Sequence, residues 1–167
     1  MNLEEISTLI ENRQFDEAIN ECNLLLAKMP EERIEILRIR AFAFDMAGDS
    51  ERSLEDHERI FEEEGVTIKD FYLAAFRAVF AAQFEKARVW FSEVLRLSRE
   101  QEETWFLSAT LFHLSYVEMQ LNDYGKAIEY LNEATLVDAD VGMPIPEGGI
   151  CTSEQLREEI ERRALGE

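Results

Sequence analysis

The side chains of this 167-residue chain that could carry chemistry are two histidines, two cysteines and many carboxylates. His57 falls on the apolar face of an expected helix and His113 lies inside a long helical segment, so we expect structural roles for both. Cys22 and Cys151 lie far apart and have no metal-ligand spacing around them. No carboxylate pair is set apart by its spacing, and neither a phosphate-binding glycine loop nor a zinc pattern is present. The sequence therefore predicts a protein that is not an enzyme, with no catalytic residues, no metal and no cofactor.

The charge of the chain is strongly acidic. Thirty-six acidic against 17 basic residues give a formal net charge of -19. Such a field repels phosphate backbones, which argues against nucleic acid, and it attracts a cationic protein. The charge therefore favours a basic protein or peptide partner. No small-molecule substrate is expected of a chain without a catalytic site. The alternative is a solvated acidic surface that only keeps the chain soluble.

Three features bear on location. The start, Met-Asn-Leu-Glu-Glu, lacks the basic region and apolar core of a secretory leader. The longest apolar stretch, residues 71–82, contains Arg77 and is too short to span a bilayer. With only two cysteines, a reducing compartment is the simpler expectation. We therefore expect a cytoplasmic protein with no membrane partner.

The apolar spacing predicts an all-α fold. Apolar residues make up 46% of the chain, and only seven glycines and three prolines interrupt it. Helices are expected in pairs, at 2–12 with 15–28, 33–47 with 50–63, 68–82 with 85–97, and 102–121 with 124–137. Ser50 is expected to cap the fourth of these helices. Segment 138–151 should be irregular, and a capping box from Thr152 to Gln155 should open a last helix at 153–165.

A short sequence motif recurs at the start of the second helix of each pair. Its anchors, Phe15, Ser50, Phe84 and Tyr124, are 35, 34 and 40 residues apart, and a small residue follows each three positions later. A period near 34 residues is typical of stacked helix-turn-helix units. Such units must stack to bury their apolar faces, and the stack leaves a surface that binds partners.

These residues resemble the tetratricopeptide repeat family over about residues 2–139. The family's small residue and the larger residue four positions later correspond here to Ala18 with Cys22, Ser53 with His57, Ala87 with Phe91, and Ala127 with Leu131. The family's proline near the end of a unit is found only as Pro30, and the first unit is the most degenerate. The resemblance implies a right-handed α-solenoid of about four such helix pairs with a C-terminal capping helix. The expected domains are the repeats at 1–139, followed by an irregular loop and capping helix at 140–167 packed on them.

The resemblance also implies a binding groove on the first helices of the pairs. Eight large side chains are expected to face it: Phe42, Met46, Tyr72, Phe76, Phe80, Phe112, Tyr116 and Met119. Arg38 and Lys69 are candidate polar contacts. The alternative is that these rings pack in the core. Segment 138–151 either packs against the end of the last repeat, which we favour, or folds back over the groove.

Two functions are consistent with these observations, both as a non-catalytic interaction module. The first is an acidic immunity-type protein that neutralises a basic toxin. The second is a secretion-type chaperone or adaptor that cradles an extended apolar segment in the groove. The charge supports the first, and the aromatic wall supports the second.

Overall fold

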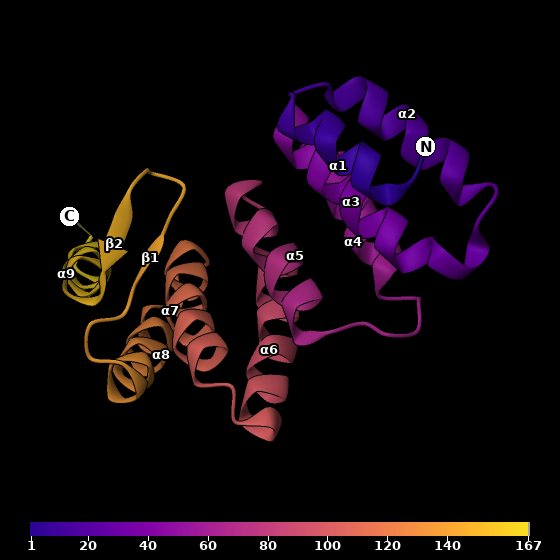
Figure 1. Ribbon diagram of the computed structural model, residues 1–167. Helices are drawn as coiled ribbons and strands as arrows, with labels where there is room; N and C mark the ends of the chain where they lie inside the picture. The colour runs from indigo at the N-terminus through magenta and orange to yellow at the C-terminus, as the bar shows by residue number, and fades with distance from the viewer. Residues whose placement is uncertain (167) are drawn as a thin grey trace. The chain divides into compact units, whose positions relative to one another are not determined.

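A computed structural model describes residues 1–166, and Glu167, the last residue of the expected 140–167 segment, lies outside the described residues. Over residues 1–166 it contains nine α-helices, one short 3-10 helix and a two-stranded hairpin. The chain divides into two compact units, Met1–Asp70 and the part from Phe71 onward. Figure 1 shows the helices of each unit packed side by side.

The first unit is built from two helix pairs. Its elements are α1 (Leu3–Glu11), α2 (Phe15–Leu26), the 3-10 helix η1 (Pro30–Glu32), α3 (Arg33–Ala47) and α4 (Ser50–Ile60). Helix α5 (Ile68–Phe80) begins with the last three residues of this unit. Buried residues from α1, α2 and α3 form one core, in which Ile6, Cys22 and Ile36 are fully buried. Burial raises the pKa of the Cys22 thiol to about 11, so this cysteine is a packing residue.

An ion pair is buried in the first unit between α3 and α4. Arg40 donates from Nε and Nη2 to the two carboxylate oxygens of Asp56, at 2.7 and 2.6 Å. Asn23 accepts from Arg40 at 2.6 Å, and Arg59 donates to Asp56 at 2.8 Å. Because every charge here has hydrogen-bonding partners, the network fixes the position of α4 against α3 rather than leaving a buried charge unpaired.

The second unit continues with two more helix pairs and a C-terminal extension. Its elements after α5 are α6 (Phe84–Gln101), α7 (Thr104–Gln120), α8 (Tyr124–Val137), β1 (Gly142–Pro144), β2 (Ile150–Thr152) and α9 (Ser153–Ala164). Helix α7 is the centre of this unit, because all twelve residues from Ser108 to Met119 are buried. Helices α6, α8 and α9 and the hairpin all contact it.

The repeat predicted from the sequence is visible in the backbone. The anchors Phe15, Ser50, Phe84 and Tyr124 are the first residues of α2, α4, α6 and α8. Two residues before each anchor the backbone is left-handed, at Arg13 (φ 62°), Gly48 (φ 81°), Ala82 (φ 54°) and Asn122 (φ 63°). Only one of these residues is glycine, so the same turn forms at a steric cost in the other units.

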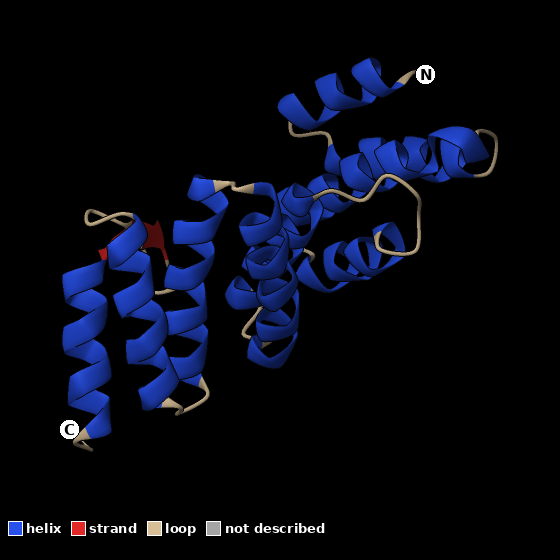
Figure 2. Ribbon diagram, turned by 90° about the horizontal axis from the view of Figure 1, so that it is seen from below, coloured by secondary structure: helices blue, strands red, loops and turns tan. Residues whose placement is uncertain are grey.

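The segment expected to be irregular contains a β-hairpin. Gly142 pairs with Thr152, Met143 with Cys151 and Pro144 with Ile150, in antiparallel register. Gly148 and Gly149 take positive φ values in the connecting turn, which glycine adopts without strain. Figure 2 shows the two strands beside the helices of the second unit. The sequence did not predict these strands, because each has only three residues.

Helix boundaries agree with the sequence to within a few residues, and one cap differs. The fourth helix is capped by Asp49, whose side chain accepts from the Arg52 amide, and Ser50 is its first residue. The predicted capping box of α9 is confirmed, with Thr152 and Gln155 bonded to each other's backbone amides at 3.2 and 2.9 Å.

Candidate partner-binding surfaces

The first unit has an open apolar pocket of about 640 Å³ between α1 and α3. Phe42 and Met46, one turn apart on α3, line it, and each is 48% exposed. Ile39 of α3 and Ile10 of α1 complete the apolar wall. Exposed large apolar side chains that gather around a hollow are typical of interaction surfaces. Two of the eight predicted groove residues are thus brought together here.

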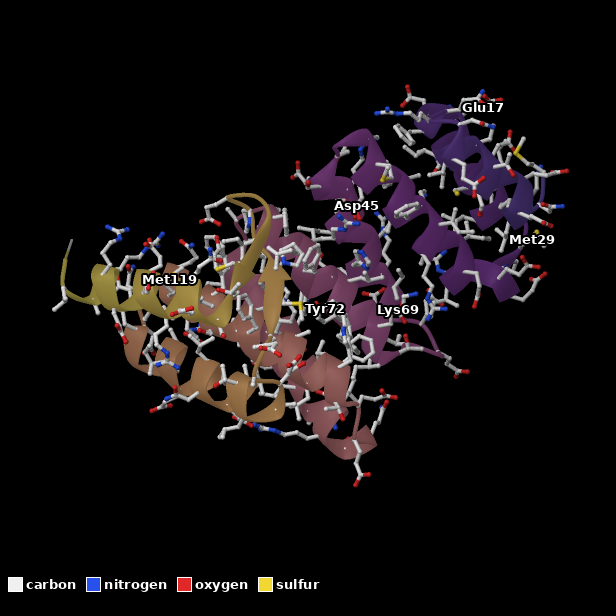
Figure 3. All side chains as sticks on the ribbon, turned by 60° about the vertical axis from the view of Figure 1, so that its left-hand side comes forward. Glu17, Met29, Asp45, Lys69, Tyr72 and Met119 are labelled. Carbon is white, nitrogen blue, oxygen red and sulfur yellow. The ribbon has the colours of Figure 1, made fainter. Side chains whose placement is uncertain are left out.

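The polar residue Arg38 also lines this pocket, but its charge is already engaged. Its guanidinium donates from Nε and Nη2 to the two carboxylate oxygens of Asp70, at 2.8 and 2.6 Å. Burial acts to raise the pKa of Asp70, but hydrogen bonds from Arg38 and Thr67 outweigh it and hold that pKa below its usual value. The same contact raises the pKa of Arg38. Lys69 is exposed and is not part of the pocket wall (Figure 3).

A row of aromatic rings follows α5 in the second unit. The Tyr72 and Phe76 rings are 6.4 Å apart and the Phe76 and Phe80 rings 4.7 Å apart, as expected for residues four positions apart on one helix face. Exposure rises along the row: Tyr72 is buried, Phe76 is half-buried and Phe80 is 44% exposed. The Trp105 ring lies 5.3 Å from Tyr72 and is exposed. Aromatic surface is therefore exposed at Phe80, at one end of the row, and at Trp105 of α7, beside the buried Tyr72 end.

The three predicted groove residues of α7 are covered, contrary to the expected exposed wall. Phe112 is fully buried, and Tyr116 and Met119 are 1% and 2% exposed. The hairpin lies against α7, and the Tyr116 hydroxyl donates to both carboxylate oxygens of Glu147 at 2.9 Å. Tyr116 and Met119 line a smaller pocket of about 220 Å³, whose other lining residues belong to the hairpin segment and α9. Segment 138–151 folds back over this face of α7, and not only against the end of the last repeat as we expected. Binding of a partner to Tyr116 or Met119 on this face would require the hairpin or α9 to move.

His113 lies in the same region and is surrounded by rings. The Phe91 ring stacks on it at 5.2 Å, and Phe76 meets it edge-on at 5.5 Å. Its ring nitrogens face the carbonyl oxygens of Ala109 at 2.9 Å and Pro144 at 3.3 Å. Burial lowers the pKa of His113 to about 4, against the opposing effect of these two carbonyls. The neutral imidazole is therefore a core residue that joins α7 to β1.

Several surface residues were missed by the sequence reasoning. Ile39 lines the α1–α3 pocket and is not among the eight predicted groove residues, although it is three residues before Phe42 and shares its face. Trp105 was not considered, because it is the second residue of α7 and falls outside the predicted stripe. An exposed position at the start of a helix gives no periodic signal.

Within residues 1–166, no three His, Cys, Asp or Glu side chains are grouped so that they could hold a metal ion. The described cysteines Cys22 and Cys151 are both free thiols. In the described part of the chain, no helix is long and apolar enough to cross a bilayer.

Tandem helix pairs with one recurring turn and open apolar surfaces define a helical-repeat protein. Residues 108–141 match the family model described as tetratricopeptide repeat. That repeat includes most of α7, all of α8 and the residues that lead to β1. The sequence match covers one repeat, and the fold of the other helix pairs is supported by solved structures. The resemblance to the tetratricopeptide repeat family is therefore confirmed.

Solved structures of tetratricopeptide proteins share this fold at low sequence identity. A crystal structure of MamA matches with a TM-score of 0.69 at 13% identity, covering 99% of this chain and 92% of that one. A structure of nearly identical TPR-like repeats of a kinesin light chain from Podosopora anserina matches with a TM-score of 0.68 at 15% identity, covering 98% and 84%. No curated protein matches the chain significantly. The all-α class of tetratricopeptide-like helix pairs is thus confirmed, and these likenesses define the fold alone.

Proposed function

We propose that this chain is a non-catalytic interaction module whose pocket between α1 and α3 receives an apolar side chain of a basic protein partner. The observation that carries the proposal is the pair Phe42 and Met46, each 48% exposed around a pocket of about 640 Å³. A pocket of this size accommodates one large apolar side chain, the usual anchor of a protein interface.

Charge supports the choice of partner. Residues 1–70 contain 19 acidic and eight basic residues, and Glu11, at the edge of the pocket, is exposed. Two cations also line the pocket: Arg38 is neutralised by Asp70, and Arg13 is exposed near Glu11, so the acidic excess lies in the surroundings of the pocket and not in its wall. A segment that carries a bulky apolar residue next to lysine or arginine therefore complements the pocket and its surroundings. These properties are the ones expected of an immunity-type protein that acts in the cytoplasm and neutralises a basic toxin.

Selection from a random peptide display library tests this proposal. The wild-type chain should enrich peptides with a large apolar residue flanked by lysine or arginine. The double variant Phe42→Ala with Met46→Ala should lose that enrichment. Leu24→Ala is a matched control in the same unit, because Leu24 is 50% exposed and lies outside the pocket wall. Equal enrichment by the double variant, or enrichment of acidic peptides, would contradict the proposal.

A second candidate is a chaperone or adaptor for an extended apolar segment. The aromatic row of α5 favours it, because Phe76, Phe80 and Trp105 leave ring surface open along more than one helical turn. Such a protein should bind an unfolded client more tightly than the folded one. An immunity-type protein should bind the folded partner at least as well. Comparing the affinity for a partner before and after denaturation separates the two functions.

A further inference from the structure

Glu118 of α7 is a charged residue at a position that a buried apolar residue occupies in other repeats. It follows the small residue Ser115 by three positions, as Phe44 follows Ala41 in α3 and Ala78 follows Ala75 in α5. Phe44 and Ala78 are buried apolar residues, and Glu118 is equally buried at 2% exposure. A carboxylate in this place costs desolvation that an apolar side chain would not.

The carboxylate of Glu118 has no hydrogen-bond donor for its buried oxygen. Among the described residues nothing donates to Oε2, and the nearest cation, Nη1 of Arg88, is 3.8 Å away, beyond hydrogen-bond distance. Arg88 is engaged with Glu85, and Nζ of Lys126 lies 2.8 Å from Asp123. Both neighbouring cations therefore have another acidic partner. Burial raises the pKa of Glu118, although Arg88 and Lys126 act to lower it.

An open pocket of about 420 Å³ adjoins this carboxylate between α6, α7 and α8. Its lining residues are Arg88, Val89, Ser92, Glu118, Lys126 and Tyr130. Val89 is 64% exposed and gives the pocket an apolar wall, and Tyr130 contributes a half-buried ring. The lining holds the cations Arg88 and Lys126 and the carboxylate of Glu118. Glu85 and Asp123, outside the lining, pair with these two cations, so the group of five carries one net negative charge.

We propose that this pocket binds one lysine or arginine side chain of a protein partner, with the cation at Glu118 and the aliphatic stem on Val89 and Tyr130. The arrangement matches an amphipathic cation: a desolvated carboxylate for the head, and an apolar wall and a ring face for the stem. The site lies entirely within the second unit, so it would provide a contact separate from the pocket between α1 and α3. It extends the proposed function, because it assigns a specific anchor to a basic partner.

Titration with capped amino acids tests this site directly. The probes are N-acetyl-lysine methylamide and N-acetyl-arginine methylamide, followed by amide shifts in 15N NMR spectra of the full chain. We expect saturable shifts at Val89, Ser92, Lys126 and Tyr130 with millimolar affinity, as one charged contact would give. N-acetyl-norleucine methylamide, which has a similar stem and no charge, should leave these amides unmoved. Equal shifts with the norleucine probe, or none with the cationic probes, would overturn the proposal.

Two variants and one control assign the effect to the carboxylate. Glu118→Gln keeps the shape and removes the charge, and Glu118→Met restores an apolar residue, so at least one should fold. Either should weaken binding at least about tenfold. Glu129→Gln, on the exposed side of α8, should bind as the wild type does. If a folded Glu118 variant binds the cationic probes as tightly as the wild type does, the carboxylate of Glu118 is not their binding group.

Two further titrations distinguish this site from the α1–α3 pocket and from a site for small amines. The double variant Phe42→Ala with Met46→Ala should leave these shifts unchanged, so failure of the α1–α3 pocket and failure of this site give different results. Free n-butylamine presents the same four-carbon stem and single ammonium without a peptide. If it binds much more tightly than both capped residues, the site belongs to a small amine and the proposed protein contact is wrong.

Discussion

At the residue scale, His113 shows how burial decides the chemistry of a titratable group. The imidazole lies between Phe91 and Phe76 and is fully buried, so the charged form would lose its hydration without gaining a counter-ion. Two backbone carbonyls face its ring nitrogens, and a neutral ring can donate to only one of them. His113, for which the sequence predicts a structural role, is therefore held neutral as part of the core.

The pKa of His113 predicts how the stability of the second unit depends on pH. Its pKa of about 4 when folded lies below the ordinary value near 6.5. The unfolded chain therefore binds more protons between these values, and the stabilisation present above pH 6.5 is lost as the pH falls toward 4. The loss should be on the order of 3 kcal/mol. His113→Phe should remove this part of the pH dependence.

Urea unfolding at several pH values measures this effect. Tryptophan fluorescence is a suitable signal, because Trp90 and Trp105, the two tryptophans of the chain, both lie in the second unit. The quantity to compare is the change in unfolding free energy from pH 7 to pH 4.5 in the wild type and in the variant. The prediction is wrong if the wild type and the variant lose equal amounts of unfolding free energy. It is also wrong if NMR shows that His113 titrates near pH 6.5, because burial would then not lower its pKa.

At the element scale, the hairpin over α7 changes which part of the surface is open. Its strands are too short to form a sheet alone, and contacts with α7 hold them in place. Tyr116 donates to Glu147 beyond β1, and His113 meets the carbonyl of Pro144. The hairpin therefore occupies the face of α7 that the repeat pattern assigns to a partner.

Removing the Tyr116 hydroxyl should loosen the hairpin without unfolding α7. Tyr116→Phe keeps the buried ring and deletes the donor to Glu147, so the expected loss of stability is about 1–2 kcal/mol. Amide hydrogen exchange in residues 142–152 should accelerate, while exchange in α7 stays slow. Tyr124→Phe is the matched control, because its hydroxyl donates to Asn122 on the surface. Unchanged exchange in the hairpin would mean that apolar contacts alone hold it.

The sequence was most informative where a local pattern decides the structure. The four anchors start four helices, because capping and turn chemistry act within a few residues. The face of α7 was harder to assign: Phe112, Tyr116 and Met119 were expected on an exposed wall, but they are buried, as are Leu111 and Leu114 on the same helix. A helix that is apolar on all of its faces is expected to be buried on all of them, but the apolar spacing does not predict which elements pack against it. The ion pair of Arg40 and Asp56 was missed for a similar reason, since it joins residues from different helices.

At the scale of the whole molecule, the net charge and the apolar pocket are expected to act at different steps of partner binding. The net charge of -19 acts over several ångströms and attracts a cationic partner before contact. The pocket with Phe42 and Met46 acts only after contact, when water leaves the apolar wall. Electrostatic attraction should therefore set the association rate, and the pocket should set the dissociation rate.

This division predicts a distinct response to salt. For a basic peptide selected on the wild-type chain, raising NaCl from about 0.05 to 0.5 M should lower the association rate constant by about tenfold or more, because the screening length becomes shorter than the distance over which the charges act. The dissociation rate constant should change little with salt, and it should rise in the double variant Phe42→Ala with Met46→Ala. Surface plasmon resonance at four salt concentrations measures both constants, and Leu24→Ala should behave as the wild type. Association that is insensitive to salt would contradict capture by charge, and it would favour the chaperone or adaptor function, in which an apolar segment is held by the rings of α5.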